Sequence, residues 1–393
     1  TPSNSSAASD VYKRQIVKYI DELLEKSTPE APMWNIEKIR QGLKSNWNYI
    51  DGVMIKAVLQ MYDVTKDEKY LKFADNFIDY RVHEDGTIDG YNIGEKNIDN
   101  VNAGKTLFEL YDLTGKEKYR KAIDLVYSQI EIMPRCNNEA RSFWHKDIYP
   151  NQVWLDGLYM GLPFYLEYET RYNDRKNYSD IFGQFKFVIE NMRNPVNGLY
   201  FHAMDTSREA FWCDKVTGLS QHSWLRAIGW YTMALIDTLD QVDNKDHKYD
   251  AECKMLEDAF KDLVDSMLKY QDESGMWYQV VNYGGMDKNY LETSGSSIMA
   301  YALLKAVRLG YLSDDYAQYA KKAIDGICER YLKTKEDGSL SLGGICLVAG
   351  LGGNGRRPGT YDYYMSEPIV EDDAKGVGPF LLAYTELLRY ENK

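Results

Sequence analysis

Cysteine is scarce in this 393-residue sequence, which has five cysteines, scattered along the chain and odd in number. None has the paired spacing of a zinc site, so we expect neither a disulfide framework nor a structural metal site. The sequence also lacks an apolar run long enough to span a bilayer and a block patterned like a secretory signal. These absences favour a reducing compartment, and we expect a cytoplasmic protein with no membrane partner.

Positive charge is in deficit, because the sequence has 47 Lys and Arg residues and 60 Asp and Glu residues, which gives a net charge of −13. This balance disfavours nucleic acid as a partner. It does not exclude a small anionic substrate, since the cations close to a site decide that locally. Aromatic residues are abundant instead, with 33 Tyr and 8 Trp. Such rings commonly fill cores, but they are also compatible with a cleft that stacks against sugars.

Helical periodicity recurs along the chain, and patterns typical of strands are few and short, at 278–283 and 198–202. Residues 1–15 are small and polar, and we expect them to be disordered or non-native, with a first helix from about residue 15 and a single domain over 16–393. The chain is therefore predicted to be all-α. The further predicted helices are 52–62, 69–80, 101–111, 118–130, 154–168, 180–192, 224–239, 251–270, 296–309, 315–331 and 378–390.

Similar turns join apolar helices to charged ones, as in Tyr62-Asp63-x-Thr65 and Tyr111-Asp112-x-Thr114. Such spacing indicates an array of helix pairs, and at roughly 50–70 residues per pair the chain holds about six. Six pairs can close into an (α/α)6 barrel, a six-hairpin toroid; an open solenoid is the alternative. Closure is favoured because no terminal pair is polar enough to cap an open array. The loops before the apolar helices are also long and rich in glycine and aromatics, as expected of loops that build a site at one end.

The segment 151–168 is predicted to be an inner helix, because nearly every face of it is apolar or aromatic. One carboxylate, Asp156, lies near its start, close to Trp154. Burial among aromatic rings makes a carboxylate costly to ionise, so we expect its pKa to rise and the group to hold a proton near neutral pH. The alternative is an acid in the first helical turn that stabilises the helix dipole.

A second acid, Asp99, opens another inner helix, a place where an acid is ordinarily an N-cap. Two carboxylates at the mouth of an aromatic barrel are also what sugar-cleaving chemistry requires. His145 and Lys146, in the loop before the central helix, can contact an anionic or hydroxylated ligand, although a solvated loop would look the same. His202 follows a turn, where a histidine with satisfied hydrogen bonds is the commoner outcome.

Arg226 lies between Trp224 and Trp230 at the start of an apolar helix. A planar cation flanked by two rings can hold a carboxylate or sugar hydroxyls, and a buried arginine that only packs is the alternative. The glycine-rich segment 343–355 lacks the G-K-[ST] ending of a phosphate loop, so we expect a flexible loop over the cleft. The neighbouring pair Asp372 and Asp373 is a thin basis for a metal site.

Four segments are specific for a known family in combination, although each alone would not be. They are W-L-D-G-L-Y-M-G-L-P-F (154–164), H-S-W-L-R-A-I-G-W (222–230), Y-L-E-T-S-G-S-S-I-M-A-Y-A-L (290–303) and D-A-K-G-V-G-P-F-L-L-A (373–383). Together they resemble glycoside hydrolase family 105, the unsaturated rhamnogalacturonyl hydrolases, and more distantly the unsaturated glucuronyl hydrolases. The resemblance extends over nearly all of the chain after residue 15. It implies an (α/α)6 barrel that acts on an unsaturated uronic-acid-containing oligosaccharide without a metal or an organic cofactor.

The resemblance implies Asp156 as the catalytic acid and Asp99 as the second acid. Substrate contacts are implied at Tyr49, His145, Lys146, Trp154, His202, Trp224, Arg226 and Trp230. The family usually has W-x-R-G-x-x-W, whereas Ala227 and Ile228 stand here, so the shape of the subsite for the leaving sugar stays open.

The reaction implied by the resemblance is removal of a Δ4,5-unsaturated galacturonic acid from the non-reducing end of lyase products. Asp156 would protonate a vinyl ether and then accept a proton from water, while Asp99 would hold hydroxyls or the water. Three alternatives remain: an unsaturated glucuronyl hydrolase, a sugar-binding toroid without activity, and a helical-repeat interaction scaffold. The scaffold is least favoured, because the aromatics stand at the starts of inner helices.

Overall fold

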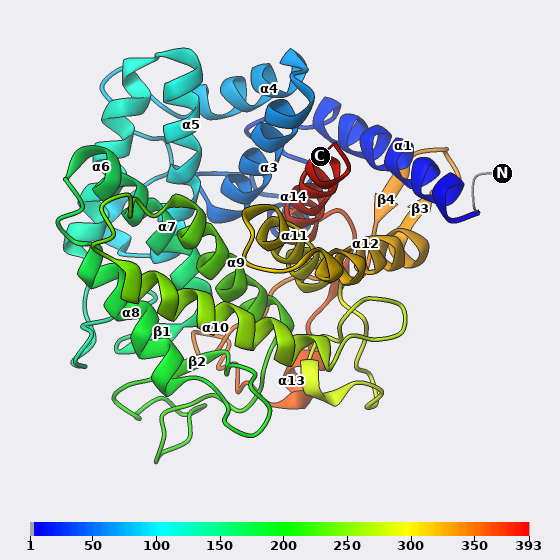
Figure 1. Ribbon diagram of the computed structural model, residues 1–393. Helices are drawn as coiled ribbons and strands as arrows, with labels where there is room; N and C mark the ends of the chain where they lie inside the picture. The colour runs from blue at the N-terminus through cyan, green and yellow to red at the C-terminus, as the bar shows by residue number, and fades with distance from the viewer. Residues whose placement is uncertain (1–3, 393) are drawn as a thin grey trace.

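The computed structural model describes residues 4–392, and within this range the chain forms fourteen α-helices and six short strands (Figure 1). The all-α prediction is confirmed, since the strands form only three two-stranded ribbons. The helices are α1 (Asn4–Glu25), α2 (Ile36–Gln41), α3 (Tyr49–Thr65), α4 (Glu68–Asp79), α5 (Lys105–Thr114), α6 (Glu117–Ile132), α7 (Leu155–Tyr172), α8 (Tyr178–Asn191), α9 (Leu225–Gln241), α10 (Asp250–Leu268), α11 (Thr293–Leu309), α12 (Ala317–Tyr331), α13 (Tyr361–Ser366) and α14 (Ala374–Glu391). The strands are β1 (Gln152–Trp154), β2 (Ala203–Asp205), β3 (Leu332–Thr334), β4 (Leu340–Leu342), β5 (Ile345–Cys346) and β6 (Ile369–Val370).

Six of the described helices form a closed inner ring (Figure 1). In chain order they are α3, α5, α7, α9, α11 and α14, and α14 packs back against α3. Helix α5 joins the ring through the 3-10 helix η2 (Ile98–Gly104), which contacts both α3 and α7. Helices α4, α6, α8, α10 and α12 each pack outside the inner helix that precedes them. The chain is therefore an (α/α)6 barrel, and the open solenoid is excluded.

Helix α1 takes the sixth outer position, between α12 and α4. The Tyr70 hydroxyl of α4 donates to Asp21 at 2.9 Å, and Lys13 pairs with Glu391 of α14 at 2.7 Å. The helix begins at Asn4, where the sequence pattern predicted disorder up to about residue 15; residues 1–3 lie outside the described part of the chain. The reason is that Tyr12 lies one helical turn before Ile16, on the same face of α1, and packs against the barrel core.

Three local predictions differ from the structure. Residues 152–154 are not helical but form β1, which pairs antiparallel with β2, so that α7 begins only at Leu155. Neither predicted strand is a full strand: 278–283 has isolated bridges at Tyr278 and Val280 and then a 3-10 helix, and 198–202 has the isolated bridge from Tyr200 to Arg193. These short segments pair with distant parts of the chain, which local periodicity does not record.

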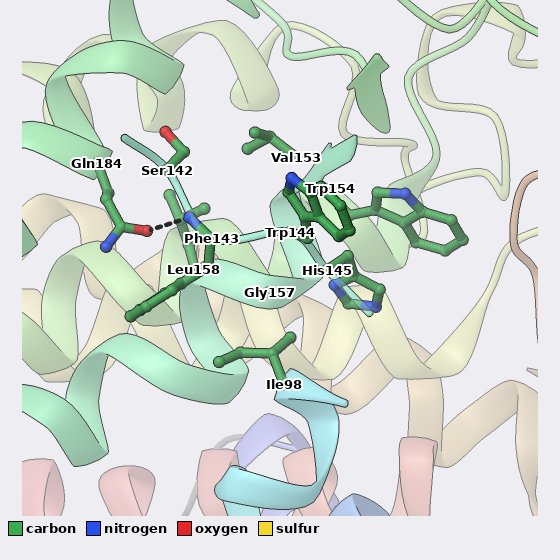
Figure 2. Close-up of a pocket in the computed structure, with 10 residues that line it drawn as sticks. All are labelled: Ile98, Ser142, Phe143, Trp144, His145, Val153, Trp154, Gly157, Leu158 and Gln184. Carbon is green, nitrogen blue, oxygen red and sulfur yellow. Dashed lines mark hydrogen bonds between the residues drawn. The ribbon is translucent and has the colours of Figure 1, made fainter. Parts of the chain in front are cut away.

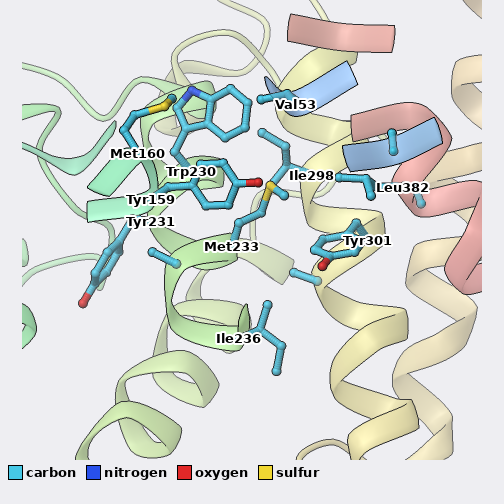
Figure 3. Packing of buried hydrophobic residues seen from close by; sticks show 14 of the residues in the cluster. Val53, Tyr159, Met160, Trp230, Tyr231, Met233, Ile236, Ile298, Tyr301 and Leu382 are labelled. Carbon is cyan, nitrogen blue, oxygen red and sulfur yellow. The ribbon is translucent and has the colours of Figure 1, made fainter. Parts of the chain in front are cut away.

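The inner helices are buried on almost every side, as the apolar pattern predicted. In α11 every residue from Thr293 to Val307 is buried, and in α14 every residue from Ala374 to Leu387. Near the barrel axis Trp230 stacks on Tyr159, with ring centroids 5.1 Å apart and planes 15° apart (Figure 3). Polar groups of these helices can therefore serve a ligand only near the helix ends.

The two ends of the barrel differ in their polar groups. Where the inner helices end, paired charges line a cavity of about 260 Å³: Lys305 lies 2.9 Å from both Asp237 and Asp240, and Arg308 pairs with Glu386 at 2.8 Å. The inner helices all begin at the opposite end, where the long loops also gather. Helix N-termini carry partial positive charge, so this second end favours anions.

We predict that Gly52→Ala lowers the free energy of unfolding by about 1–3 kcal/mol, because an added methyl group must displace a neighbouring backbone. A Cβ at Gly52 would lie 2.5 Å from the Cα of Ala103 in η2. Gly183→Ala is the matched control: it lies in outer helix α8 with nothing within 4 Å, and should gain about 0.5–1 kcal/mol. Urea unfolding followed by circular dichroism measures both, and equal stability of the Gly52 variant and wild type would contradict the close packing.

Candidate active site

A cavity of about 170 Å³ opens at the end of the barrel where the inner helices begin. Both predicted acids and four of the predicted contact residues line it together. The lining residues are Glu37, Tyr49, Asp99, His145, Lys146, Tyr149, Trp154, Asp156, Met160, Val348, Ala349 and Arg357. Residues spread over most of the chain are thus collected into one site.

Backbone pairing between loops sets the positions of the two acids. An isolated bridge joins Asn97 to Lys146, and the Ile98 N–H donates to the His145 carbonyl at 3.1 Å, which places Asp99 beside both cationic candidates. At the second acid, β1 pairs with β2, and the Leu155 N–H donates to the His202 carbonyl at 3.1 Å. This pairing holds His202 next to the first turn of α7, which carries Asp156.

Asp99 is a buried anion with two basic neighbours. Lys146 Nζ lies 2.9 Å from its Oδ2, and His145 Nε2 lies 3.3 Å from its Oδ1. Burial alone would raise the pKa of Asp99, but the attraction of Lys146 and then of His145 outweighs it and holds the pKa well below its usual value. Lys146 is therefore paired with Asp99, and Asp99 stays ionised.

Asp156 faces a buried histidine. Its side chain is 14% exposed, and its Oδ2 lies 3.4 Å from His202 Nε2. Both atoms are buried without a hydrogen-bond partner among the described residues. The other ring nitrogen of His202, Nδ1, lies 2.7 Å from the Tyr364 hydroxyl. Buried polar atoms are rarely left unpaired, so these two atoms mark a place where a water or a ligand group would complete the hydrogen bonding.

One wall of the cavity is a set of nearly parallel rings. His145 stacks on Trp154 with centroids 4.6 Å apart, and Tyr149 stacks on Trp154 at 5.0 Å. Figure 2 shows His145 and Trp154 beside a second, much smaller hollow that Ile98 and Phe143 also line. Its volume of about 10 Å³ holds at most about one water, so it is not a sugar site.

Four predicted contact residues lie outside the cavity lining. One is His202, described above beside Asp156, and the other three are Trp224, Arg226 and Trp230. Arg226 is 1% exposed and donates to the carbonyls of Cys346 at 2.6 Å and Leu347 at 3.4 Å. Trp224 donates to Gln279 at 3.0 Å, and Trp230 stacks on Tyr159. Arg226 thereby holds the segment that continues into cavity residues Val348 and Ala349, while a direct substrate contact of these three stays a prediction.

The sequence interpretation missed six lining residues: Glu37, Tyr149, Met160, Val348, Ala349 and Arg357. Glu37 belongs to the short helix α2, which showed no clear period, and pairs with the fully buried Lys375 at 2.9 Å. Arg357 follows the glycine-rich segment that was expected to be a flexible loop. Two adjacent arginines at the end of that segment were the available signal for an anion site.

No group of three or more His, Cys, Asp or Glu side chains within residues 4–392 is arranged to hold a metal ion. In the same range, every helix is too short or too polar to traverse a bilayer.

Comparison with known proteins gives consistent relatives. The family described as Glycosyl Hydrolase Family 88 matches residues 19–391. The structure of a family 105 glycoside hydrolase from C. acetobutylicum ATCC 824 is 42% identical, covers 97% of this chain and 99% of its own, and has a TM-score of 0.87. The unsaturated rhamnogalacturonyl hydrolase YesR of Bacillus subtilis (strain 168) is 26% identical over 300 residues, 75% of this chain and 78% of its own. An unsaturated glucuronyl hydrolase from Bacillus sp. GL1 shares the fold at 15% identity, with coverage of 88% and 87% and a TM-score of 0.63.

We predict that Lys146→Met lowers the free energy of unfolding by about 1–3 kcal/mol at neutral pH, because it leaves the buried charge of Asp99 less compensated. The folded pKa of Asp99 is below its ordinary 3.8, so its stabilising contribution is present above that pH and is lost as the pH falls through the folded value. The pKa of Lys146 is raised above 10.5, so its contribution is lost only at higher pH.

The difference between wild type and Lys146→Met should therefore be widest at neutral pH and shrink below about pH 4. Urea unfolding at a series of pH values measures it. Lys44→Met is the control: Lys44 pairs with Glu30 at 3.0 Å on the surface, and its loss should leave stability unchanged. A difference for Lys146→Met that did not vary with pH would contradict the assigned ion pair.

Proposed function

The chain belongs to Glycosyl Hydrolase Family 88, and from this membership we propose that it removes a Δ4,5-unsaturated galacturonic acid from the non-reducing end of rhamnogalacturonan lyase products. The likeness to a family 105 structure at 42% identity and to YesR supports this choice of substrate. The observation that carries the proposal is the pair of acids in one cavity, Asp99 held ionised and Asp156 with a buried oxygen unpaired.

Asp156 is the acid and then the base of the reaction. It transfers its proton to C4, and the electron pair of the C4=C5 bond forms the new C4–H bond. The positive charge left at C5 is shared with the ring oxygen. Water adds at C5 while the Asp156 carboxylate accepts the proton that this water loses, which returns Asp156 to its acid form.

The sugar leaves after hydration. The new hydroxyl at C5 makes a hemiketal, which opens to a ketone and leaves a hemiacetal at C1. That hemiacetal collapses and releases the neighbouring sugar. The glycosidic bond is therefore broken as a consequence of hydration, and no second carboxylate has to attack C1.

Asp99 serves this reaction as a fixed negative charge. Because Lys146 and His145 hold it ionised, it accepts hydrogen bonds from sugar hydroxyls or from the attacking water. A carboxylate near the developing positive charge at C5 also stabilises that charge. Its neighbours are oriented by backbone pairing, so the charge needs little reorganisation during the reaction.

The direction of the inner helices suits an anionic substrate. All six begin at the end of the barrel where the cavity opens, and α7, which contributes Asp156 to the lining, begins at Leu155 with no side-chain hydrogen bond from its N-cap residue Trp154 among the described residues. Free N–H groups and the helix dipole both favour an anion near such a start. A uronate is therefore a better match to this end of the barrel than a neutral sugar.

We predict that the protein removes the ultraviolet absorbance of the double bond in an unsaturated galacturonyl-rhamnose disaccharide. Asp156→Asn should lower kcat by roughly 10²–10⁴-fold, because it removes the proton donor. Asp147→Asn is a matched control, since Asp147 lies in the adjacent loop with a side chain 50% exposed and only a 3.9 Å approach to Lys96. It should retain wild-type turnover.

The same assay separates the alternatives. Turnover of an unsaturated glucuronyl disaccharide from chondroitin, without turnover of the rhamnose-linked one, would move the assignment to the glucuronyl hydrolases. Binding of both disaccharides with no loss of absorbance would favour the sugar-binding toroid. An Asp156→Asn variant as active as wild type would remove Asp156 from the role of acid.

A further inference from the structure

We propose that Arg357 is the residue that binds the carboxylate of the unsaturated uronate. This inference rests on the proposed function and adds a specificity-determining residue that lies in none of the four family-like segments. It follows from the balance of charge around the cavity, from the way the glycine-rich loop is built, and from the geometry that a carboxylate needs.

The other cations near the cavity already have partners. Lys146 lies 2.9 Å from Asp99, and Lys375 lies 2.9 Å from Glu37 and 3.1 Å from Asp373. Arg226 gives its hydrogen bonds to backbone carbonyls. Arg357 lines the cavity and makes no ion pair within 4.0 Å among the described residues.

An anion needs such an uncompensated cation here. The cavity is lined by three carboxylates, those of Glu37, Asp99 and Asp156. Lys146 pairs with Asp99, whereas Lys375 is shared between Glu37 and Asp373. The guanidinium of Arg357 has no carboxylate partner within 4.0 Å among the described residues, so it offsets the remaining negative charge, and a uronate meets less repulsion with Arg357 than without it.

The glycine-rich loop is folded around this arginine. The Gly352 N–H donates to the Arg357 carbonyl at 2.8 Å, and Arg357 returns bonds from its own N–H and its Nε to the Gly352 carbonyl, both at 3.1 Å. At Gly350 an added Cβ would lie 2.4 Å from Arg357 Nη1, so a larger residue there would displace the guanidinium from its position. Gly350 therefore fits the placement of Arg357, whereas Gly344 packs against Tyr331.

The position of Arg357 is rigid. Leu351 is fully buried in a small cluster with Trp154, Trp212 and Tyr149, separate from the barrel core. Arg357 Nη2 donates to the Tyr149 hydroxyl at 2.9 Å, and Tyr149 stacks on Trp154. The guanidinium is therefore held in place by the same rings that form the cavity wall, and little freedom is lost when a ligand binds.

The geometry suits a carboxylate. A guanidinium presents donors in a planar fork that matches two carboxylate oxygens, which an ammonium group does not. Arg357 Nη1 has no hydrogen-bond partner among the described residues, so the fork is not saturated. A uronate carboxylate at C5 lies next to the atom that Asp156 protonates, within the same cavity.

The test compares a charged ligand with its neutral ester. In an Asp156→Asn background, calorimetry measures binding of the unsaturated galacturonyl-rhamnose disaccharide and of its C6 methyl ester. Arg357→Gln should weaken binding of the acid by about 10–100-fold, the range for a hydrogen bond to a charged group. Binding of the methyl ester should change by less than about threefold, because it has no charge to lose.

Arg356→Gln is the matched control, since Arg356 is the exposed neighbour whose guanidinium lies 4.6 Å from the Phe211 ring centroid. It should leave the affinity for both ligands unchanged. Arg357→Lys keeps the charge but not the fork, so its affinity for the acid should fall between wild type and Arg357→Gln. If thermal melting shows that Arg357→Gln does not fold, the lysine variant carries the comparison.

Equal weakening of acid and ester by Arg357→Gln would overturn the proposal, because Arg357 would then only shape the wall. Unchanged binding of the acid would overturn it as well. A wild-type protein that fails to consume the disaccharide, together with charge-selective loss of binding in Arg357→Gln, would defeat the proposed function and still support Arg357 as the carboxylate-binding residue.

Discussion

The burial of the inner helices on almost every side is the constraint on which the rest of the structure depends. Helices such as α11 and α14 contribute apolar groups to their neighbours over most of their length, so most of their charged groups lie near the helix ends. Where the inner helices end, the charges are paired with one another, as Lys305 is with Asp237 and Asp240. Where the helices begin, charged groups and the long loops line the cavity that holds Asp99 and Asp156.

The loops at the cavity end also position the side chains of the site. They pair with one another as short strands and bridges, and these pairings set Asp99 beside Lys146 and His202 beside Asp156. The two acids consequently have different surroundings, although both stand near the start of an inner helix. Asp99 is held ionised by Lys146 and His145, whereas Asp156 lies 3.4 Å from the buried His202 and has one oxygen without a hydrogen-bond partner among the described residues. This difference matches the separate electrostatic and proton-transfer roles that we propose for the two acids.

Some residues predicted to contact the ligand instead hold the structure around the cavity. Arg226 donates hydrogen bonds to the backbone carbonyls of Cys346 and Leu347, and the chain continues from there to the cavity lining. Trp230 belongs to the barrel core through Tyr159. The arginine that meets the cavity is Arg357, from a loop without a recognisable binding motif. Arg226 and Arg357 thus differ: Arg226 is bonded to backbone carbonyls outside the cavity lining, and Arg357 lies beside the glycine-rich segment and lines the cavity.

The sequence by itself determined the helical class and nearly all the long helices, because hydrophobic periodicity is a local property that burial imposes on each helix separately. It also pointed to Asp99 and Asp156 near the starts of inner helices, and both line one cavity, while their catalytic roles stay a prediction. It also predicted that Tyr49, His145, Lys146 and Trp154 belong to the site, and all four line the cavity with the acids. Only the tertiary structure decided that Lys146 pairs with Asp99, that residues 152–154 are a strand, and that Glu37 and Arg357 reach the cavity. Those features depend on contacts between residues far apart in the chain, and such contacts exist only once the ring of helices has closed.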